Sequence, residues 1–248
     1  MIRLGIHLDP VAVLRHAGGG REPDLLAAGH AAMVGGADQV IVRLRPQGPG
    51  ASEADVRRLR EVLSIPLHVD VEATAASVAL MKAIRPEHVC LVPAWKLGAP
   101  AAGLDLTVDA TADAIRGVLA ALREDGLSAS VLVEPEEAAL VAASGVEAEV
   151  VELIARRYGA ADTDARRVVA LRELERSAAS ARALGMRVHV GRGLDYGNVS
   201  RVAALEDVEA VHAGHAVAGR ALFLGYQVAV AELRVRATRA PKDEAVAP

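Results

Sequence analysis

The sequence predicts a single (β/α)₈ barrel, and three observations carry this prediction: its length, its composition and its alternating segments. The chain has 248 residues, of which 52% are hydrophobic and 2% aromatic, so we expect one α/β core built mostly from Ala, Val and Leu. Apolar runs of strand length alternate with helix-period segments along the chain, which is the pattern of parallel βα repeats. A TIM barrel of this length is ordinary.

Eight short apolar runs are expected to form the strands of the barrel. They are Ile2–Asp9, Gln39–Leu44, Leu67–Val71, His88–Val92, Ala129–Val133, Glu149–Leu153, Arg187–Val190 and Ala210–Ala213. Eight is the strand number of a TIM barrel. We therefore expect the barrel domain to span residues 1–240, and residues 241–248 to form a frayed, disordered tail.

Helices are expected between these strands, where start signals precede apolar residues at helical spacing. Ser52 is a candidate N-cap after the second strand, Pro135 opens a helix after the fifth, and residues 162–164 begin a long helix that stops at Gly185. Two segments rich in Pro or Gly, Arg45–Gly50 and Trp95–Gly103, are expected to be loops at the barrel mouth and candidates for a lid.

Charge and cysteine content exclude several classes of protein. The net charge of −4 argues against a nucleic-acid-binding protein, which would carry a clustered basic surface. The single cysteine, Cys90, excludes an internal disulfide framework, and its apolar neighbours indicate a buried strand residue. The N-terminus lacks a signal-peptide pattern and no apolar stretch is long enough to cross a membrane. We expect a cytoplasmic protein with a small-molecule ligand and no membrane partner.

Two similar strand ends near the C-terminus indicate an anion-binding site. His189–Leu194 and His212–Ala216 each leave an apolar run and open into glycine before a helix. Glycine lets backbone N–H groups approach a ligand, and a helix N-terminus carries partial positive charge. Since the last two strands of a TIM barrel often hold a phosphate at this position, we expect a small anionic or phosphorylated substrate beside Gly193, Gly214 and His215.

Strand alternation predicts which polar side chains face the barrel interior. The first and third strands carry the same spacing, His7-Leu8-Asp9 and His68-Val69-Asp70, and both pairs are expected to face one cavity. The other inward candidates are Arg43, Arg45, Glu152, His189 and His212.

Motifs along nearly the whole chain, up to about Arg236, resemble the pyridoxine 5'-phosphate synthase family. They are Gly5-Ile6-x-Leu8-Asp9, Leu14-Arg15-x-Ala17, Pro23-Asp24, Val42-x-Leu44-Arg45, Asp55-Val56-Arg57, Cys90-Leu91-Val92-Pro93, Gly103-Leu104-Asp105, Gly191-x-Gly193-Leu194, Tyr196-x-Asn198-Val199 and Gly214-His215-Ala216-x-x-Gly219-Arg220-Ala221. The resemblance implies a TIM barrel of vitamin B6 biosynthesis, a transferase that condenses 1-deoxy-D-xylulose 5-phosphate with 3-amino-2-oxopropyl phosphate. It also implies that no metal cofactor is needed and that the chain assembles as a homo-oligomer, an octamer.

The resemblance also assigns roles to individual residues. The positions that match substrate-binding, transition-state-stabilising or phosphate-binding residues of the family are Asp9, Arg45, Glu152, Gly193, Gly214 and His215. Asp70 stands in place of a catalytic glutamate, and Arg43 and Arg192 stand in place of two catalytic histidines. Further departures from the family pattern are Pro10 for a histidine, Gly18 for an arginine, and the neutral stretch Gln47–Gly50 for a basic loop.

These departures change the expected chemistry. Histidine exchanges protons near neutral pH, whereas arginine stays protonated and only binds or stabilises negative charge. We therefore expect condensation or lyase-type chemistry that has diverged from vitamin B6 synthesis. In this hypothesis Asp70 transfers protons, Glu152 is a polarising partner, and Arg43, Arg45 and Arg192 clamp the anion.

Two alternatives stay open on the same barrel. His7, His68, His189 and His212 stand where the family has asparagine, and with Asp9, Asp70 and Glu152 they could hold a transition metal such as Zn, Mn or Fe. The competing interpretation, favoured because no compact metal motif is present, is that these histidines bind substrate, His7 among them, or stabilise the core. The other alternative is a catalytically silent protein that binds a metabolite.

Three further histidines, His16, His30 and His88, are expected to have surface or packing roles.

Overall fold

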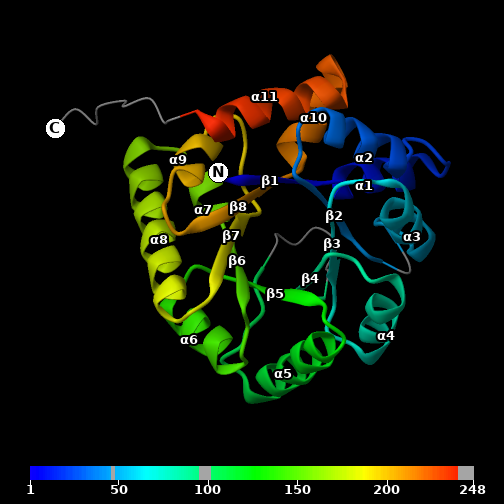
Figure 1. Cartoon of the computed structure of the whole chain (residues 1–248). Helices are drawn as coiled ribbons and strands as arrows, with labels where there is room; N and C mark the ends of the chain where they lie inside the picture. Colours follow the sequence, from blue (N-terminus) through cyan, green and yellow to red (C-terminus); the bar gives the residue numbers. More distant parts are fainter. Residues whose placement is uncertain (46–47, 95–101, 240–248) are drawn as a thin grey trace.

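Eight parallel strands close into a barrel at the centre of the molecule, in the order β1 to β8 with β8 paired to β1 (Figure 1). The structure, a computed structural model, describes residues 1–45, 48–94 and 102–239. The strands are β1 (Arg3–His7), β2 (Gln39–Arg43), β3 (Leu67–Val71), β4 (His88–Leu91), β5 (Ser128–Val133), β6 (Val150–Ile154), β7 (Arg187–Gly191) and β8 (Val208–Ala213). All eight predicted strands are confirmed, with ends that differ by at most two residues.

Helices surround the barrel and cover its outer face (Figure 1). They are α1 (Asp9–Gly18), α2 (Leu25–Val34), α3 (Glu53–Val62), α4 (Ala75–Ile84), α5 (Asp109–Glu124), α6 (Glu137–Gly145), α7 (Arg156–Gly159), α8 (Asp164–Ala183), α9 (Val199–Ala203), α10 (His215–Leu224) and α11 (Tyr226–Thr238). The last helix, α11, packs against α2, α9 and α10, so the end of the described chain returns to the first βα unit. The (β/α)₈ barrel predicted from the sequence is confirmed.

The predicted helix starts are also confirmed by their capping contacts. Ser52 and Asp55 form a capping box at α3: the Asp55 amide donates to Ser52 Oγ (3.2 Å) and the Ser52 amide donates to Asp55 Oδ2 (2.8 Å). The Thr163 hydroxyl accepts from the Arg166 amide at the start of α8. These bonds satisfy amide groups that have no partner within their helices.

The predicted loops and tail fall partly outside the described residues. Of Arg45–Gly50, residues 46–47 are outside, while Leu44 bridges to Ala51 and Arg45 donates to the Pro49 carbonyl oxygen (2.7 Å). Residues 95–101 of the second loop and the tail at 241–248 are also outside, so neither lid nor tail is tested. No helix within the described ranges is long and apolar enough to cross a membrane.

The hydrophobic core lies between the barrel and its helices, because outward strand residues are apolar. Leu4 and Ile6 on β1, and Val40 and Val42 on β2, are fully buried there. The predicted burial of Cys90 is confirmed as well. Cys90 belongs to a second, smaller apolar cluster with Val92, Leu132 and Ile154, and its Sγ lies 3.9 Å from Glu152 Oε2.

Candidate active site at the carboxyl ends of the strands

A cavity of about 790 Å³ opens among residues that follow the carboxyl ends of the strands, between α1 and α10. Its polar lining is Asp9, Arg43, Arg45, Arg192 and His215, which come from the ends of β1, β2, β7 and β8. Apolar side chains of α1 and α10 form much of the remaining wall. Three guanidinium groups in one cavity favour a negatively charged ligand.

Arg192 lies over two buried carboxylates and pairs with both. Its Nη2 pairs with Asp70, and its Nε donates to Glu152 Oε1 (3.2 Å), while Asp70 and Glu152 are 0% and 2% exposed. Burial alone would raise the pKa of Glu152, but the charges of Arg192 and His212 hold that pKa well below its usual range. Burial lowers the pKa of Arg192, but Asp70 and Glu152 outweigh it and raise this pKa above its ordinary value. Arg192 is therefore permanently cationic.

The backbone at Arg192 is held in the left-handed region, with φ of 63°. This conformation is uncommon for a residue other than glycine. We attribute it to the two ion pairs, which fix the guanidinium beneath the cavity.

Asp9 connects β1 to β2 at the rim of the cavity. Its Oδ1 accepts from the Arg43 amide (2.6 Å), and its Oδ2 lies 3.2 Å from His7 Nδ1. Burial raises the pKa of Asp9, but the hydrogen bond and charge of His7 bring it below its ordinary value. The Arg43 guanidinium donates to the Pro93 carbonyl oxygen, which fixes its position beside Asp9.

Histidines fill the barrel below this cavity. Ring centroids are 4.7 Å apart for His68 and His88, 6.3 Å for His68 and His189, and 5.2 Å for His189 and His212. Burial is the main reason why the pKa values of His68 and His189 fall below the ordinary value and why that of His88 falls to about 3. These three rings are therefore neutral near pH 7.

His88 was expected to have a surface or a packing role, and the structure shows the packing role. It lies inside the barrel at the start of β4, where its two ring nitrogens bond Ser128 Oγ (2.9 Å) and Ser130 Oγ (2.8 Å). His16 and His30 lie on the exposed faces of α1 and α2, as the sequence indicates. The sequence interpretation failed at His88 because the Pro-Glu turn before it obscured its position as the first residue of a strand.

The four predicted inner histidines do face the barrel interior, but they do not form one set of metal ligands. Among the described residues, the groups whose ligand atoms all lie within 4.8 Å of one another are His7, Glu152 and His212, and His7, Asp9 and Asp70. His68 and His189 belong to neither group. Glu152 thus converges with His7 and His212 in a buried triad that could hold a metal.

The glycine turns after β7 and β8 lie where the anion site is expected. Gly214 precedes α10, whose first residue, His215, lines the cavity. Gly193 has φ of 151°, and a Cβ atom there would lie 2.7 Å from the Ala155 carbonyl oxygen. On α7, a Cβ atom at Gly159 would lie 2.2 Å from the Gly193 carbonyl oxygen. Only glycine therefore fits at either side of this contact.

The close contact between α7 and the turn after β7 gives a testable prediction. Gly159→Ala should displace Gly193, lower the free energy of unfolding by about 1–3 kcal/mol through overpacking, and weaken phosphate binding. Gly117→Ala, in the middle of α5 where a Cβ atom meets nothing within 4 Å, should instead raise stability by about 0.5–1 kcal/mol. Urea denaturation and phosphate titration of both variants check this, and equal stability changes would contradict it.

Several predicted site residues are buried behind the cavity wall. Asp70, Glu152 and His7 are 0%, 2% and 5% exposed, and none of them lines the cavity. A substrate in the cavity therefore meets Asp9, Arg43, Arg45, Arg192 and His215 first.

Gln39 is a site residue that the sequence reading missed. It is 1% exposed, and its Nε2 lies 2.9 Å from His212 Nε2. Strand alternation could have found it, because Gln39 lies four residues before Arg43 on β2 and therefore on the same, inward side of the strand.

A closed (β/α)₈ barrel with a cavity at the carboxyl ends of its strands belongs to the class of TIM-barrel proteins, whose active sites lie at this end. Within this class, residues 4–239 match the family described as pyridoxal phosphate biosynthesis protein PdxJ, and the chain belongs to that family.

Relatives of known name agree with this assignment. A pyridoxine 5'-phosphate synthase from Synechococcus sp. is 36% identical over 234 residues, which cover 94% of this chain and 98% of the relative. The enzyme of the same name from Rhodospirillum rubrum is 35% identical over 234 residues, 94% of each chain.

Solved structures with low sequence identity show the same fold. N-(5'-phosphoribosyl)anthranilate isomerase from Pyrococcus furiosus superposes with a TM-score of 0.61 at 15% identity, covering 96% of this chain and 98% of its own. Thiamine phosphate pyrophosphorylase from the same organism gives a TM-score of 0.59 at 16% identity, with 95% of both chains covered. These likenesses support the TIM-barrel architecture alone.

Proposed function

We propose that this chain is an enzyme that binds a small phosphorylated substrate in the cavity between α1 and α10 and performs condensation or lyase-type chemistry there. One observation carries the proposal: Arg43, Arg45 and Arg192 line a single cavity that His215 also lines, at the start of α10. Arginine side chains and a helix N-terminus both favour a phosphate group. The names of the relatives, pyridoxine 5'-phosphate synthases, favour phosphorylated substrates as well.

The reaction in this proposal has diverged from that of the named relatives. By the resemblance, Arg43 and Arg192 replace two catalytic histidines, and Arg192 is locked in ion pairs with Asp70 and Glu152. Because its pKa is raised, Arg192 stabilises negative charge but does not shuttle protons. Proton transfer in this site therefore falls to carboxylates.

Asp70 is the proposed proton-transfer group, although Arg192 covers it. A carboxylate oxygen of Asp70 lies within 4.8 Å of ligand atoms of His7 and Asp9, and Asp9 lines the cavity. Within the described residues, Asp70 Oδ1 is buried with no hydrogen-bond partner, so it is available to exchange a proton with this pair. Glu152, held ionised beneath Arg192, is the proposed polarising partner.

The anion site predicts which arginines a phosphate needs. Arg43→Gln and Arg45→Gln should each weaken the binding of inorganic phosphate about 10- to 100-fold, since a charge-assisted hydrogen bond contributes about 1.5–3 kcal/mol. The matched control is Arg57→Gln on the outer face of α3, where the side chain pairs with Glu53 one turn away in the same helix. Calorimetric titration in the presence of a chelator measures all three. Phosphate affinity unchanged in both cavity variants would contradict the proposed function.

Metal-dependent chemistry on the same barrel is the second candidate. The observation that favours it is the convergence of His7, Glu152 and His212 within 4.8 Å. The family resemblance implies no metal, so this candidate depends on these side chains alone.

A homo-oligomer, an octamer by the resemblance, is the proposed assembly. Exposed apolar side chains on α10, Leu222 at 73% and Phe223 at 87%, are consistent with contacts between copies.

A further inference from the structure

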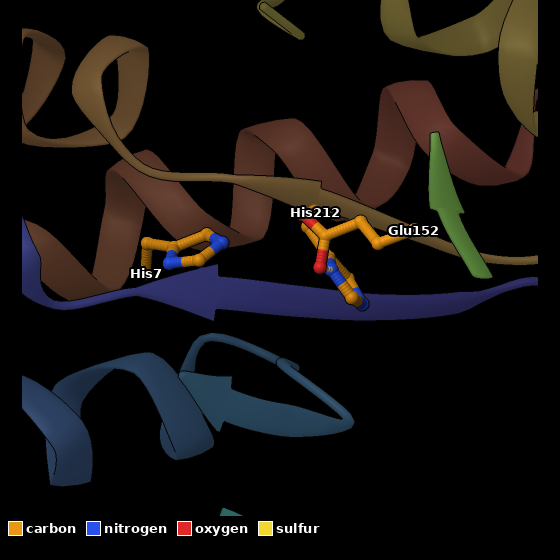
Figure 2. A group of neighbouring side chains, drawn as sticks. All are labelled: His7, Glu152 and His212. Atoms are coloured by element: carbon orange, nitrogen blue, oxygen red, sulfur yellow. Dashed lines mark ion pairs between the residues drawn. The ribbon is translucent and has the colours of Figure 1, made fainter. Parts of the chain in front are cut away.

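We propose that His7, Glu152 and His212 bind one divalent transition-metal ion inside the barrel. One ligand atom from each residue lies within 4.8 Å of the others, and the three residues are 5%, 2% and 1% exposed. Figure 2 shows His7 from β1 and the pair Glu152 and His212, from β6 and β8, with the His7 ring pointing toward the Glu152 carboxylate. This inference deepens the second candidate function and does not depend on the anion cavity.

In the part of the chain that the structure describes, two buried ring nitrogens of the triad have no hydrogen-bond partner. They are His7 Nε2 and His212 Nδ1. His212 Nδ1 lies 3.1 Å from Glu152 Oε2, within ion-pair distance. Two ligands of one ion, each about 2.1 Å from it and at right angles, are about 3 Å apart, so this pair already has the separation of neighbouring metal ligands. Leaving such nitrogens buried and unbonded is costly, and an ion would satisfy both.

The other nitrogen of each ring is held by a second residue. His7 Nδ1 lies 3.2 Å from Asp9 Oδ2. When Nδ1–H donates to this carboxylate, Nε2 carries no proton and its lone pair can bind an ion. In the structure, Gln39 Nε2 lies 2.9 Å from His212 Nε2 and donates to it. A half-turn of the amide would exchange its oxygen and nitrogen, so that the oxygen accepts from Nε2–H and the Nδ1 lone pair is left for an ion. The His7–Asp9 contact, and the Gln39 contact after this turn, match the outer partners that orient metal-binding histidines in known sites.

Three glycines provide the space that the triad occupies. A Cβ atom at Gly5 would lie 2.7 Å from the His212 ring, one at Gly191 would lie 2.6 Å from Glu152 Oε1, and one at Gly214 would lie 2.7 Å from His7 Cβ. Each triad side chain therefore occupies space beside a glycine that lies on a neighbouring strand or directly after one. A side chain at any of these three glycines would displace a member of the triad.

The donor set selects the class of metal. Two imidazole nitrogens and one carboxylate oxygen suit Fe²⁺, Mn²⁺, Co²⁺ or Zn²⁺, whereas Mg²⁺ and Ca²⁺ prefer oxygen ligands alone. Three protein ligands leave further coordination positions for water or substrate. Glu152 can serve the ion and Arg192 together, because Oε1 faces Arg192 and Oε2 faces His212.

A cobalt titration tests the site with a readout other than activity. Chelator-treated protein should bind one Co²⁺ per chain and develop visible absorption bands of a nitrogen- and oxygen-ligated ion. His7→Gln and His212→Gln should weaken Co²⁺ binding at least about 100-fold, because loss of even an outer partner typically costs 10–100-fold. The matched control is His189→Gln, a buried ring in the same barrel that is outside the triad, and its Co²⁺ affinity should stay within about threefold of the unmodified chain.

The outcomes separate this site from the proposed function. No stoichiometric Co²⁺ in the unmodified chain would overturn the site whether or not the variants fold, and so would full binding in folded His7→Gln protein. Phosphate binding in the presence of chelator tests the anion cavity separately. Protein that binds phosphate but not Co²⁺ would refute the metal site alone, and the reverse result would refute the proposed substrate class alone.

Discussion

Arg192→Gln should be the most destabilising single substitution of a charged residue in this site. The change leaves Asp70 and Glu152, which are 0% and 2% exposed, without the guanidinium that pairs with both. Breaking a buried ion pair by removing one partner costs about 3–5 kcal/mol, because the remaining charge is left desolvated. We expect the free energy of unfolding at pH 7 to fall by about this amount in urea denaturation.

The pH dependence of this loss follows from Glu152. Its pKa is depressed in the folded protein, so its stabilising contribution is present above the unfolded value of 4.5 and is lost as the pH falls through the depressed folded pKa. The difference between the Arg192→Gln variant and the unmodified chain should therefore shrink below about pH 4.5. The control Arg166→Gln removes an exposed pair with Asp162 and should cost about 0–1 kcal/mol. Equal effects of both substitutions would contradict the buried-pair account.

Mild acid should lower the stability of the protein before its carboxylates are protonated. His68, His88 and His189 have folded pKa values below the ordinary 6.5, and His88 is at about 3, because burial disfavours the charged ring. The unfolded chain binds protons at these residues below pH 6.5 and the folded chain does not, so stability is lost as the pH falls. Three such groups remove about 4 kcal/mol between pH 7.5 and pH 5.5.

Two histidine variants distinguish this cause from general acid effects. His88→Gln removes one buried ring and should reduce the loss between pH 7.5 and pH 5.5 by about a third. His30→Gln removes an exposed ring of α2 and should leave the pH dependence unchanged. Urea denaturation across this pH range measures the stability of both variants. If the stability of the unmodified chain does not change with pH, the claim that these three histidines are buried in the neutral form is wrong.

Much of the fold could be predicted because strand and helix periodicities are local. The eight strands, the Ser52 cap and the start of α8 each follow from residues within one short segment. The inward direction of His7, His68, His189 and His212 also follows from strand alternation alone.

The contacts within the site could not be predicted, since they depend on how far along the barrel axis each side chain lies. Alternation does not say that Glu152 reaches His212, nor that Arg192 lies over Asp70. These contacts depend on the registers of β6, β7 and β8, including the shift between Val188 and His189. For the same reason, alternation could not single out the triad of His7, Glu152 and His212 from the four predicted histidines. The His68 ring packs against that of His88 instead.

The most direct test of the central claim is a product assay. We expect this PdxJ-family chain to bind a phosphorylated substrate but, with Arg43 and Arg192 in place of two histidines of the family pattern, not to perform the family condensation. Purified protein is incubated with 1-deoxy-D-xylulose 5-phosphate and 3-amino-2-oxopropyl phosphate, and pyridoxine 5'-phosphate is measured by mass spectrometry beside the Rhodospirillum rubrum relative. We predict no product above the protein-free control from this chain. Formation of pyridoxine 5'-phosphate at a rate comparable to that of the relative would contradict the account.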